Sequence, residues 1–257
     1  MKVGEVMGEA ITIDKNRKLS DALELMEKNN ISSLVVVDEG EICGIITDKD
    51  IIRELGSSKH GKLLPSSLHV SSAMSRKLIT VEKDTDIREA AKLMLDNKIS
   101  SIPVVDNGEI VGIVCAIDII RTLINSEVPV KEIMSNYVIV VSPEDRVVHA
   151  RRLMLDNNIS RVIVVEKGKI VGILTEKDVV KALIAFKKHA DKLQFSRIRN
   201  LMVEDVMNQE VITIGEDASV GEAIKLMTEN GISGLPVTKD GKLVGIITKT
   251  DILKLYV

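Results

Sequence analysis

The hydrophobic positions of this chain repeat one pattern four times. An isoleucine–serine pair begins an aliphatic run in each copy, and a glycine, an aspartate and an earlier isoleucine recur at fixed distances from it. Self-similarity at a fixed spacing is the signature of a repeat protein, so we expect tandem copies of one unit of about sixty residues. The recurring positions are Ile31, Ile99, Ile159 and Ile232; Gly44, Gly112, Gly172 and Gly245; Asp50, Asp118, Asp178 and Asp251; and Ile11, Ile79, Ile139 and Ile212.

Within each unit the pattern predicts the order strand, helix, strand, strand, helix. The short first strand is expected at 10–13, 78–81, 138–141 and 211–214. In the first unit Leu19, Ala22, Leu25 and Met26 recur at helical spacing and predict a helix with one buried face. A glycine-containing turn then joins two strands, which is typical of a hairpin. A second helix is expected near each aspartate, so the fold class is α/β (α+β), made of β-α-β-β-α units.

The joints between the units differ in length and are polar. One joint is rich in glycine and serine (56–61), and another is charged (187–192). A unit of this size has little hydrophobic core of its own, so we expect neighbouring units to pair. The predicted units are 1–56, 68–127, 128–187 and 201–257, paired as modules 1–127 and 128–257.

Composition narrows the function classes. Aromatic residues make up 2% of the chain and the net charge is −3, which argues against nucleic acid as a partner. No apolar run reaches the roughly 18 residues of a membrane span, and the N-terminus lacks a signal-peptide core, so we expect no membrane contact and a cytoplasmic location. Cys43 and Cys115 are expected to be buried reduced thiols, because no metal-binding spacing surrounds them.

The segment after each recurring glycine carries the candidate chemistry. It reads as a strand ending in threonine, followed by a helix start with aspartate three residues further on. One interpretation is a capping box that satisfies free N–H groups of the helix. The other is a ligand site, because a helix N-terminus suits a phosphate and a carboxylate can accept two hydrogen bonds from a ribose diol. The pairs are Thr47 with Asp50, Thr175 with Asp178, and Thr248 with Asp251.

This ordered set of motifs resembles the CBS domain, a family named for cystathionine β-synthase, and it covers essentially the whole chain. In that family two units pair into a Bateman module whose clefts bind AMP, ADP, ATP or S-adenosylmethionine. The resemblance implies that the aspartate holds the ribose hydroxyls and that the threonine contacts ribose or phosphate. It also implies that the partner unit's Ile-Ser-x segment surrounds the adenine. Two modules are expected to form a flat disc, within one chain or in a homodimer.

Carried onto this sequence, the resemblance implies four clefts with two walls each. Thr248 and Asp251 would face Ile139, Ile159, Ser160 and Arg161; Thr175 and Asp178 would face Ile212, Ile232, Ser233 and Gly234; Thr47 and Asp50 would face Ile79, Ile99, Ser100 and Ser101; and Asp118 would face Ile11, Ile31, Ser32 and Ser33.

The four clefts are not expected to be equal. Cys115 stands where the other units have threonine, and a thiol is a weak hydrogen-bond partner, so the Asp118 cleft is predicted to be weak or empty. Arg161 resembles the phosphate-binding arginines of the γ subunit of AMP-activated protein kinase, a member of the family; the alternative is a solvated surface arginine. We therefore rank the Asp251 cleft first. A basic residue also follows each aspartate by three positions, either to meet phosphate or to solvate the helix: Arg53, Arg121, Lys181 and Lys254.

The resemblance therefore implies a non-catalytic sensor of adenine nucleotides that signals to a partner protein not named by the sequence. The alternatives are a sensor of S-adenosylmethionine or another adenosyl ligand, and an interaction scaffold with vestigial sites. An enzyme is disfavoured because no catalytic or cofactor-binding motif is present, and no cofactor is expected to be required. A ligand that touches both units of a pair would shift their packing.

Overall fold

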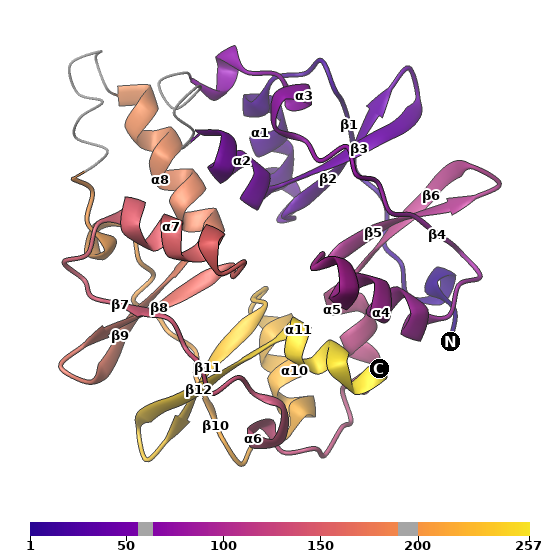
Figure 1. Ribbon diagram of the computed structural model, residues 1–257. Coiled ribbons are helices and arrows are strands. Elements are labelled where there is room, and N and C mark those ends of the chain that lie inside the picture. Colours follow the sequence, from indigo (N-terminus) through magenta and orange to yellow (C-terminus); the bar gives the residue numbers. More distant parts are fainter. Residues whose placement is uncertain (56–63, 190–199) are drawn as a thin grey trace. The chain divides into compact units, whose positions relative to one another are not determined.

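The structure is a computed structural model that describes residues 1–55, 64–189 and 200–257. It contains four three-stranded sheets, one in each predicted unit, with the helices that the pattern predicts (Figure 1). In each sheet the first strand pairs parallel with the second, and the second pairs antiparallel with the third. The predicted α/β fold class and β-α-β-β-α order are therefore confirmed.

The elements take the following bounds in chain order. The strands are β1 (Thr12–Asp14), β2 (Ser33–Asp38) and β3 (Glu41–Thr47); β4 (Val81–Glu82), β5 (Ser101–Asp106) and β6 (Glu109–Cys115); β7 (Val140–Val141), β8 (Arg161–Glu166) and β9 (Lys169–Thr175); and β10 (Ile214–Gly215), β11 (Gly234–Lys239) and β12 (Lys242–Thr248). The helices are α1 (Leu19–Asn29), α2 (Asp48–Leu55), α3 (Val70–Ala73), α4 (Ile87–Asn97), α5 (Ala116–Ile120), α6 (Val130–Ile133), α7 (Val147–Asp156), α8 (Glu176–His189), α10 (Val220–Glu229) and α11 (Lys249–Leu253).

The first strand of each unit is shorter than predicted and begins later. The expected strand at 78–81 is reduced to β4, whose two residues pair with Val104 and Val105 of β5. The same shift occurs in the other three sheets, and β1 pairs over three residues. The expected first positions lie just before the parallel ladder and make only single backbone bonds to it, such as the 3.1 Å bond from Val35 N to Ile11 O.

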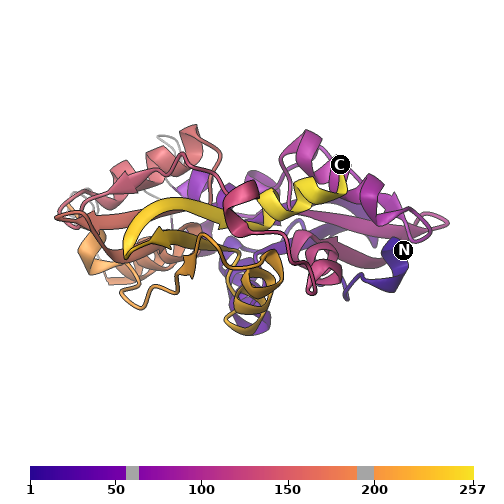
Figure 2. The ribbon, with the colours of Figure 1, turned by 90° about the horizontal axis from the view of Figure 1, so that it is seen from below.

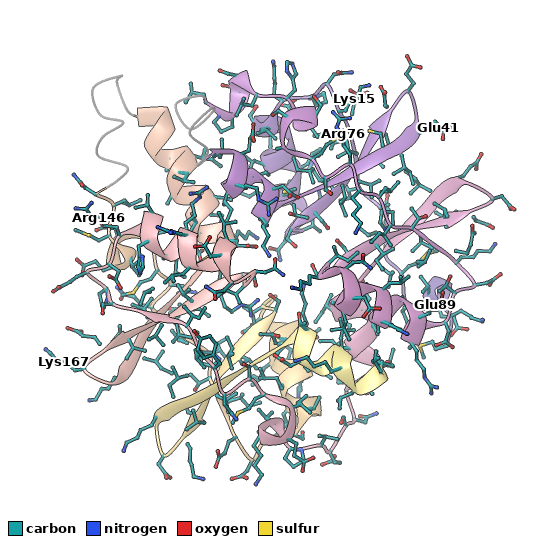
Figure 3. The ribbon with its side chains drawn as sticks, viewed as in Figure 1. Lys15, Glu41, Arg76, Glu89, Arg146 and Lys167 are labelled. Carbon is teal, nitrogen blue, oxygen red and sulfur yellow. The ribbon has the colours of Figure 1, made fainter. Side chains whose placement is uncertain are left out.

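The hairpins turn where the glycines predict. Both central residues of the first turn have positive φ, 51° at Glu39 and 92° at Gly40. A two-residue turn of this kind matches the twist of the flanking strands, and glycine adopts its second position without steric cost. The paired strands β11 and β12 run side by side in both ribbon views (Figure 2). Glu41 begins the strand that follows the first turn, and Lys167 lies within the turn of the third repeat (Figure 3).

The helix that follows each first strand buries the predicted face. In α1 the side chains of Leu19, Ala22 and Met26 are buried, whereas Leu25 is half-buried. Leucines at the equivalent place in α4, α7 and α10 are half-buried as well. The methionine positions therefore pack in the core, as their spacing indicates.

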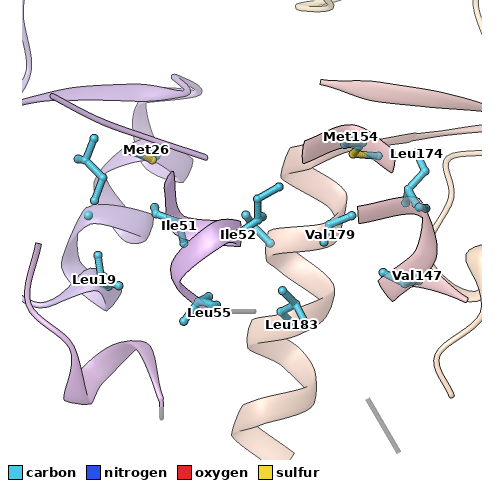
Figure 4. Close-up of a cluster of buried hydrophobic side chains, with 14 of the residues drawn as sticks. Leu19, Met26, Ile51, Ile52, Leu55, Val147, Met154, Leu174, Val179 and Leu183 are labelled. Atoms are coloured by element: carbon cyan, nitrogen blue, oxygen red, sulfur yellow. The ribbon is translucent and has the colours of Figure 1, made fainter. Parts of the chain in front are cut away.

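The chain folds as two compact units that each combine two repeats. Unit 1 comprises residues 1–10, 79–138 and 212–257, and unit 2 comprises residues 11–78 and 139–211. In unit 2 the second helix of the first repeat, α2, packs against the second helix of the third repeat, α8. Ile52 and Val179 meet between these helices (Figure 4). In unit 1 α5 packs against α11 in the same way. The predicted modules 1–127 and 128–257 combine residues of both units, so that pairing stays a prediction.

A second recurring motif, Val-x-x-x-Met, was missed by the sequence analysis. It precedes each repeat at 3–7, 70–74, 130–134 and 203–207, and its valines are fully buried. Each motif pairs with the last strand of a different repeat, as Ser75 does with Ile45 through backbone bonds of 2.9 and 3.1 Å. The recurring glycines make room for this approach, since a Cβ at Gly44 would lie 2.6 Å from the Ser75 carbonyl oxygen.

Several smaller predictions can also be compared with the structure. Cys43 and Cys115 form no disulfide, but both are half-buried rather than buried. No helix in the described ranges is long and apolar enough to span a membrane. The Gly/Ser-rich joint at 56–61 lies outside the described residues, as does the part of the charged joint after residue 189.

Candidate functional site

Three of the four repeats build the same hydrogen-bonded arrangement at the end of the last strand, which we call the T-x-x-D end. In the first repeat Thr47 Oγ1 donates to Asp50 Oδ2 at 2.6 Å, and Thr47 N donates to the same oxygen at 3.0 Å. Asp50 N donates back to Thr47 Oγ1 at 3.3 Å. Distances at the ends formed by 175–178 and 248–251 agree within 0.1 Å. The capping box predicted from the sequence is therefore confirmed.

The end in the second repeat is weaker because Cys115 replaces threonine. Cys115 N still donates to Asp118 Oδ2 at 2.9 Å, but the hydroxyl donor is lost. Burial raises the pKa of the thiol to about 11, so it stays protonated and is a poor donor. Burial also raises the pKa of Asp118. The side-chain partner of this carboxylate is therefore a weak thiol donor, where its three counterparts have a hydroxyl.

The second carboxylate oxygen of each aspartate faces the basic residue three positions on, with one exception. Arg53 lies 3.4 Å from Asp50 Oδ1, and Lys254 lies 2.8 Å from Asp251 Oδ1. Arg121 approaches Asp118 to 3.6 Å. Lys181 instead pairs with Glu27 of α1 at 3.4 Å, and no ion pair of Asp178 occurs within the described ranges. The basic residues are half or more exposed, so a ligand can displace them at small cost.

Each Ile-Ser-x segment lies beside the T-x-x-D end of its own repeat. The carbonyl oxygen of Ser32 accepts a 3.2 Å bond from Asp48 N, and Ser33 pairs across the hairpin with Thr47. The other repeats place their serines and the residues after them in the same way; these are Ser100 and Ser101, Ser160 and Arg161, and Ser233 and Gly234.

The isoleucines predicted to surround adenine are partly buried at the edge of the two cores. In unit 2 they are Ile11, Ile31, Ile139 and Ile159, and in unit 1 they are Ile79, Ile99, Ile212 and Ile232. Every predicted cleft combines an aspartate of one unit with isoleucines of the other. The pairing of the two walls therefore stays a prediction.

Arg161 is not the solvated surface arginine of the alternative interpretation. Its exposed fraction is 8%, its Nη2 donates to Ser160 Oγ at 2.9 Å, and its charge acts on Glu176 in the same repeat. Buried guanidinium groups usually have an acidic partner. The Arg161 guanidinium therefore partly compensates the charge of Glu176 inside unit 2. A contact of Arg161 with phosphate stays a prediction.

Buried acids occupy the residue after threonine in both repeats of unit 2. Asp48 and Glu176 are 8% and 9% exposed and begin the paired helices α2 and α8. Burial raises the pKa of Asp48 to about 6 and that of Glu176 to about 7, and the neighbouring Lys49 only partly offsets the effect at Glu176. Lys49 lies 3.7 Å from Glu176 Oε1, while its Nζ donates to Asn158 at 2.9 Å. These two acids were not singled out from the sequence.

Unit 1 has different side chains at the same two places. Ala116 begins α5 and Lys249 begins α11, so the paired helices carry no acid there. Lys249 is close enough for its charge to act on Asp118 and Cys115. The two units therefore share a scaffold but differ in charge beside their T-x-x-D ends.

Other features offer less to a ligand. Among the described residues, no three His, Cys, Asp or Glu side chains are grouped so as to hold a metal ion. An open depression of unit 2 is lined by residues of the α7 region, including Arg146 (Figure 3), His149 and Arg152, and it contains no T-x-x-D residue.

The repeats match the model of the CBS domain over residues 3–57, 70–125, 130–185 and 203–257. Together with the three-stranded sheets and their T-x-x-D ends, this match defines the class, and the chain belongs to the CBS-domain family. The family predicted from the sequence is thus confirmed.

Two relatives that match nearly the whole chain come from one organism. The chain is 32% identical to the uncharacterized protein MJ1404 of Methanocaldococcus jannaschii over 98% of its own length, but spans 61% of that protein. It is 30% identical to MJ1225 of the same organism, covering 96% of this chain and 95% of that protein. The crystal structure of MJ1225, described as a candidate archaeal homologue of γ-AMPK, superposes with a TM-score of 0.90 at 27% identity over the full length of both chains.

Proposed function

We propose that the chain is a regulatory sensor that binds adenosyl ligands at its T-x-x-D ends and passes their presence to a partner protein. The observation that carries the proposal is the repeated geometry at Asp50, Asp178 and Asp251. One carboxylate oxygen is fixed by the capping box, and the other meets at most an exposed, displaceable base. A pre-oriented carboxylate of this kind suits a ribose diol.

The ligand class follows from the family and from the site. The match to MJ1225, described as a candidate γ-AMPK homologue, supports AMP, ADP and ATP. We rank the end at Asp251 first, because Lys254 lies 2.8 Å from its second carboxylate oxygen and is placed to meet a phosphate, and the end at Asp118 last, because Cys115 lacks a hydroxyl. S-adenosylmethionine is the second candidate, favoured by the acids beside the ends of unit 2.

Isothermal titration calorimetry with AMP, ATP and S-adenosylmethionine tests the proposal. We expect Asp251→Asn to remove the tightest nucleotide site and Asp118→Asn, its matched control, to leave that site unchanged. Hydrogen exchange should show that both variants keep the fold. Absence of binding of all three ligands to the unaltered chain at millimolar concentration would overturn the proposal.

A further inference from the structure

We propose that Asp48 and Glu176 select ligands by charge at the T-x-x-D ends of unit 2, disfavouring polyphosphates and favouring a cationic adenosyl ligand. The inference rests on the proposed function and names the ligand class for two of its sites. It also assigns polyphosphate ligands to unit 1, where Ala116 and Lys249 replace the two acids.

The backbone places both acids next to the proposed ribose-binding groups. Each follows the threonine of its end and precedes the aspartate by two residues. Their N–H groups donate to the carbonyl oxygens of Ser32 and Ser160, at 3.2 and 3.0 Å, so neither residue is free to swing away with the helix end. Both are less than one-tenth exposed, and a charge that is poorly solvated acts on a nearby charge more strongly than one in water.

The lysines that follow the two acids direct their ammonium groups to asparagine side chains. Lys49 Nζ is bonded to Asn158, and Lys177 Nζ is bonded to Asn30 at 2.8 Å. Glu176 Oε1 is buried and accepts no hydrogen bond from the part of the chain that the structure describes; its ion pair with Lys49 is 3.7 Å long. The negative charge is therefore only partly compensated.

The field of the acids reaches the proposed ligand groups. Burial raises the pKa of Glu176 most, the charge of Asp48 adds to the effect, and the charge of Asp50, at the end of the first repeat, makes a smaller contribution in the same direction. A phosphate bound beside Asp50 would add negative charge in the same region. The charged groups that face Glu176 are Lys49, Asp48, Arg161 and Asp50, and those that face Asp48 are Glu176, Lys177 and Lys181.

The test measures ligand binding at the two T-x-x-D ends of one unit at a time, using the full chain with the ends of the other unit inactivated. Asp118→Asn with Asp251→Asn leaves the ends of unit 2, and Asp50→Asn with Asp178→Asn leaves those of unit 1. In the first background we add Asp48→Asn and Glu176→Gln, singly and together. The control is Glu24→Gln, which removes an exposed carboxylate of α1 in the same unit. ATP and S-adenosylmethionine are titrated at pH 5.5 and pH 8.

At pH 8 we expect that loss of both acids tightens the binding of ATP about tenfold and weakens the binding of S-adenosylmethionine by a similar factor. A tenfold change is what a charge coupling of one pKa unit implies. At pH 5.5 the effect should shrink, because the acids of the unaltered chain are then largely protonated. Glu24→Gln should change neither affinity, and Lys249→Gln should weaken ATP at the ends of unit 1.

Two results would overturn the inference. If both ligands bind but their affinities do not move in opposite directions in the variants, charge selection is wrong and the proposed function stands. If neither ligand binds in any background, the proposed function fails and the inference fails with it. Hydrogen exchange of each variant, with the single substitutions as backup, separates these results from misfolding.

Discussion

Unit 2 begins its paired helices α2 and α8 with Asp48 and Glu176, whereas unit 1 begins α5 and α11 with Ala116 and Lys249. The hydrophobic surroundings are the same in both, since each helix pair is closed by buried aliphatic side chains. The comparison shows that repetition is strict where side chains fill the core and relaxed where they border a candidate site. The function of each unit must therefore be argued from its own side chains.

The largest expected effect tests the buried aliphatic core that the helix pairs of both units share. Ile51→Ala in unit 2 and Ile252→Ala in unit 1 each remove a fully buried side chain from the helix pair. Each should lower the free energy of unfolding by about 3 kcal/mol, through lost burial and the cavity left behind. Denaturant unfolding measures the loss, and hydrogen exchange locates it. Val140→Ala, at a side chain 46% exposed, is the control and should cost little. A loss in one unit alone would show that the cores are not equivalent.

The next prediction concerns pH and should separate the units. The pKa of Asp48 is raised to about 6 and that of Glu176 to about 7, so the folded state holds protons that the unfolded chain releases. The contribution of these two groups to the free energy of unfolding is therefore fully present below about pH 4. It is lost as the pH rises through about 6 to 7. Between pH 5.5 and pH 8 the two groups together lose about two pKa units of coupling, so the free energy of unfolding of unit 2 should fall by roughly 2–3 kcal/mol, measured by hydrogen exchange of α2 and α8.

Glu176→Gln should flatten this profile and stabilise unit 2 above pH 7, while α5 and α11 of unit 1 should show no matching change. A wild-type profile that is flat between pH 5 and pH 8 in unit 2 would contradict the account of the two acids.

A smaller effect tests the T-x-x-D end at Asp118, where cysteine replaces threonine. Thr175→Ala removes the hydroxyl that closes the capping box, and it should cost about 1 kcal/mol. Cys115→Ala should cost less, because the thiol that it removes is a weak donor and the backbone N–H bond to Asp118 remains. Cys115→Thr should stabilise unit 1 by restoring the hydroxyl. Thermal unfolding of the three variants checks the order; equal losses for Thr175→Ala and Cys115→Ala would refute it.

The smallest effect is expected at the exposed bases. Arg53 pairs with Asp50 at 3.4 Å, but its side chain is 64% exposed, so Arg53→Ala should change stability by less than about 0.5 kcal/mol. Its effect on ligand affinity is the informative readout. Weaker binding of ATP would assign Arg53 to phosphate, whereas tighter binding of a neutral adenosyl ligand would show that it competes with ribose for Asp50.

Much of the fold could be predicted from the sequence because periodic aliphatic positions and turn glycines determine it. The helix face at Leu19, the turn at Gly40 and the T-x-x-D boxes all follow from patterns that are visible within one repeat. The packing of the Val-x-x-x-Met motifs could not be predicted, because each motif pairs with the last strand of another repeat, and only the folded chain shows which one.

The site could be predicted less completely, because its charges interact across repeats. Asp48 and Glu176 are more than one hundred residues apart, and nothing in either local segment shows that the two lie in one buried region. Only the packing of α2 on α8 buries both and places Lys49 of one repeat beside Glu176 of the other. Arg161 was likewise misjudged as exposed in one interpretation, since nothing local shows that its strand places it beside Glu176.

Hydrogen exchange of the unaltered chain at pH 8, with ATP, with S-adenosylmethionine and without ligand, tests the central claim most directly. The account predicts that ATP protects 248–252 most, that S-adenosylmethionine protects 47–51 and 175–179, and that 115–119 changes least with either. Protection that is absent from every T-x-x-D end, or equal for both ligands at all four, would contradict it.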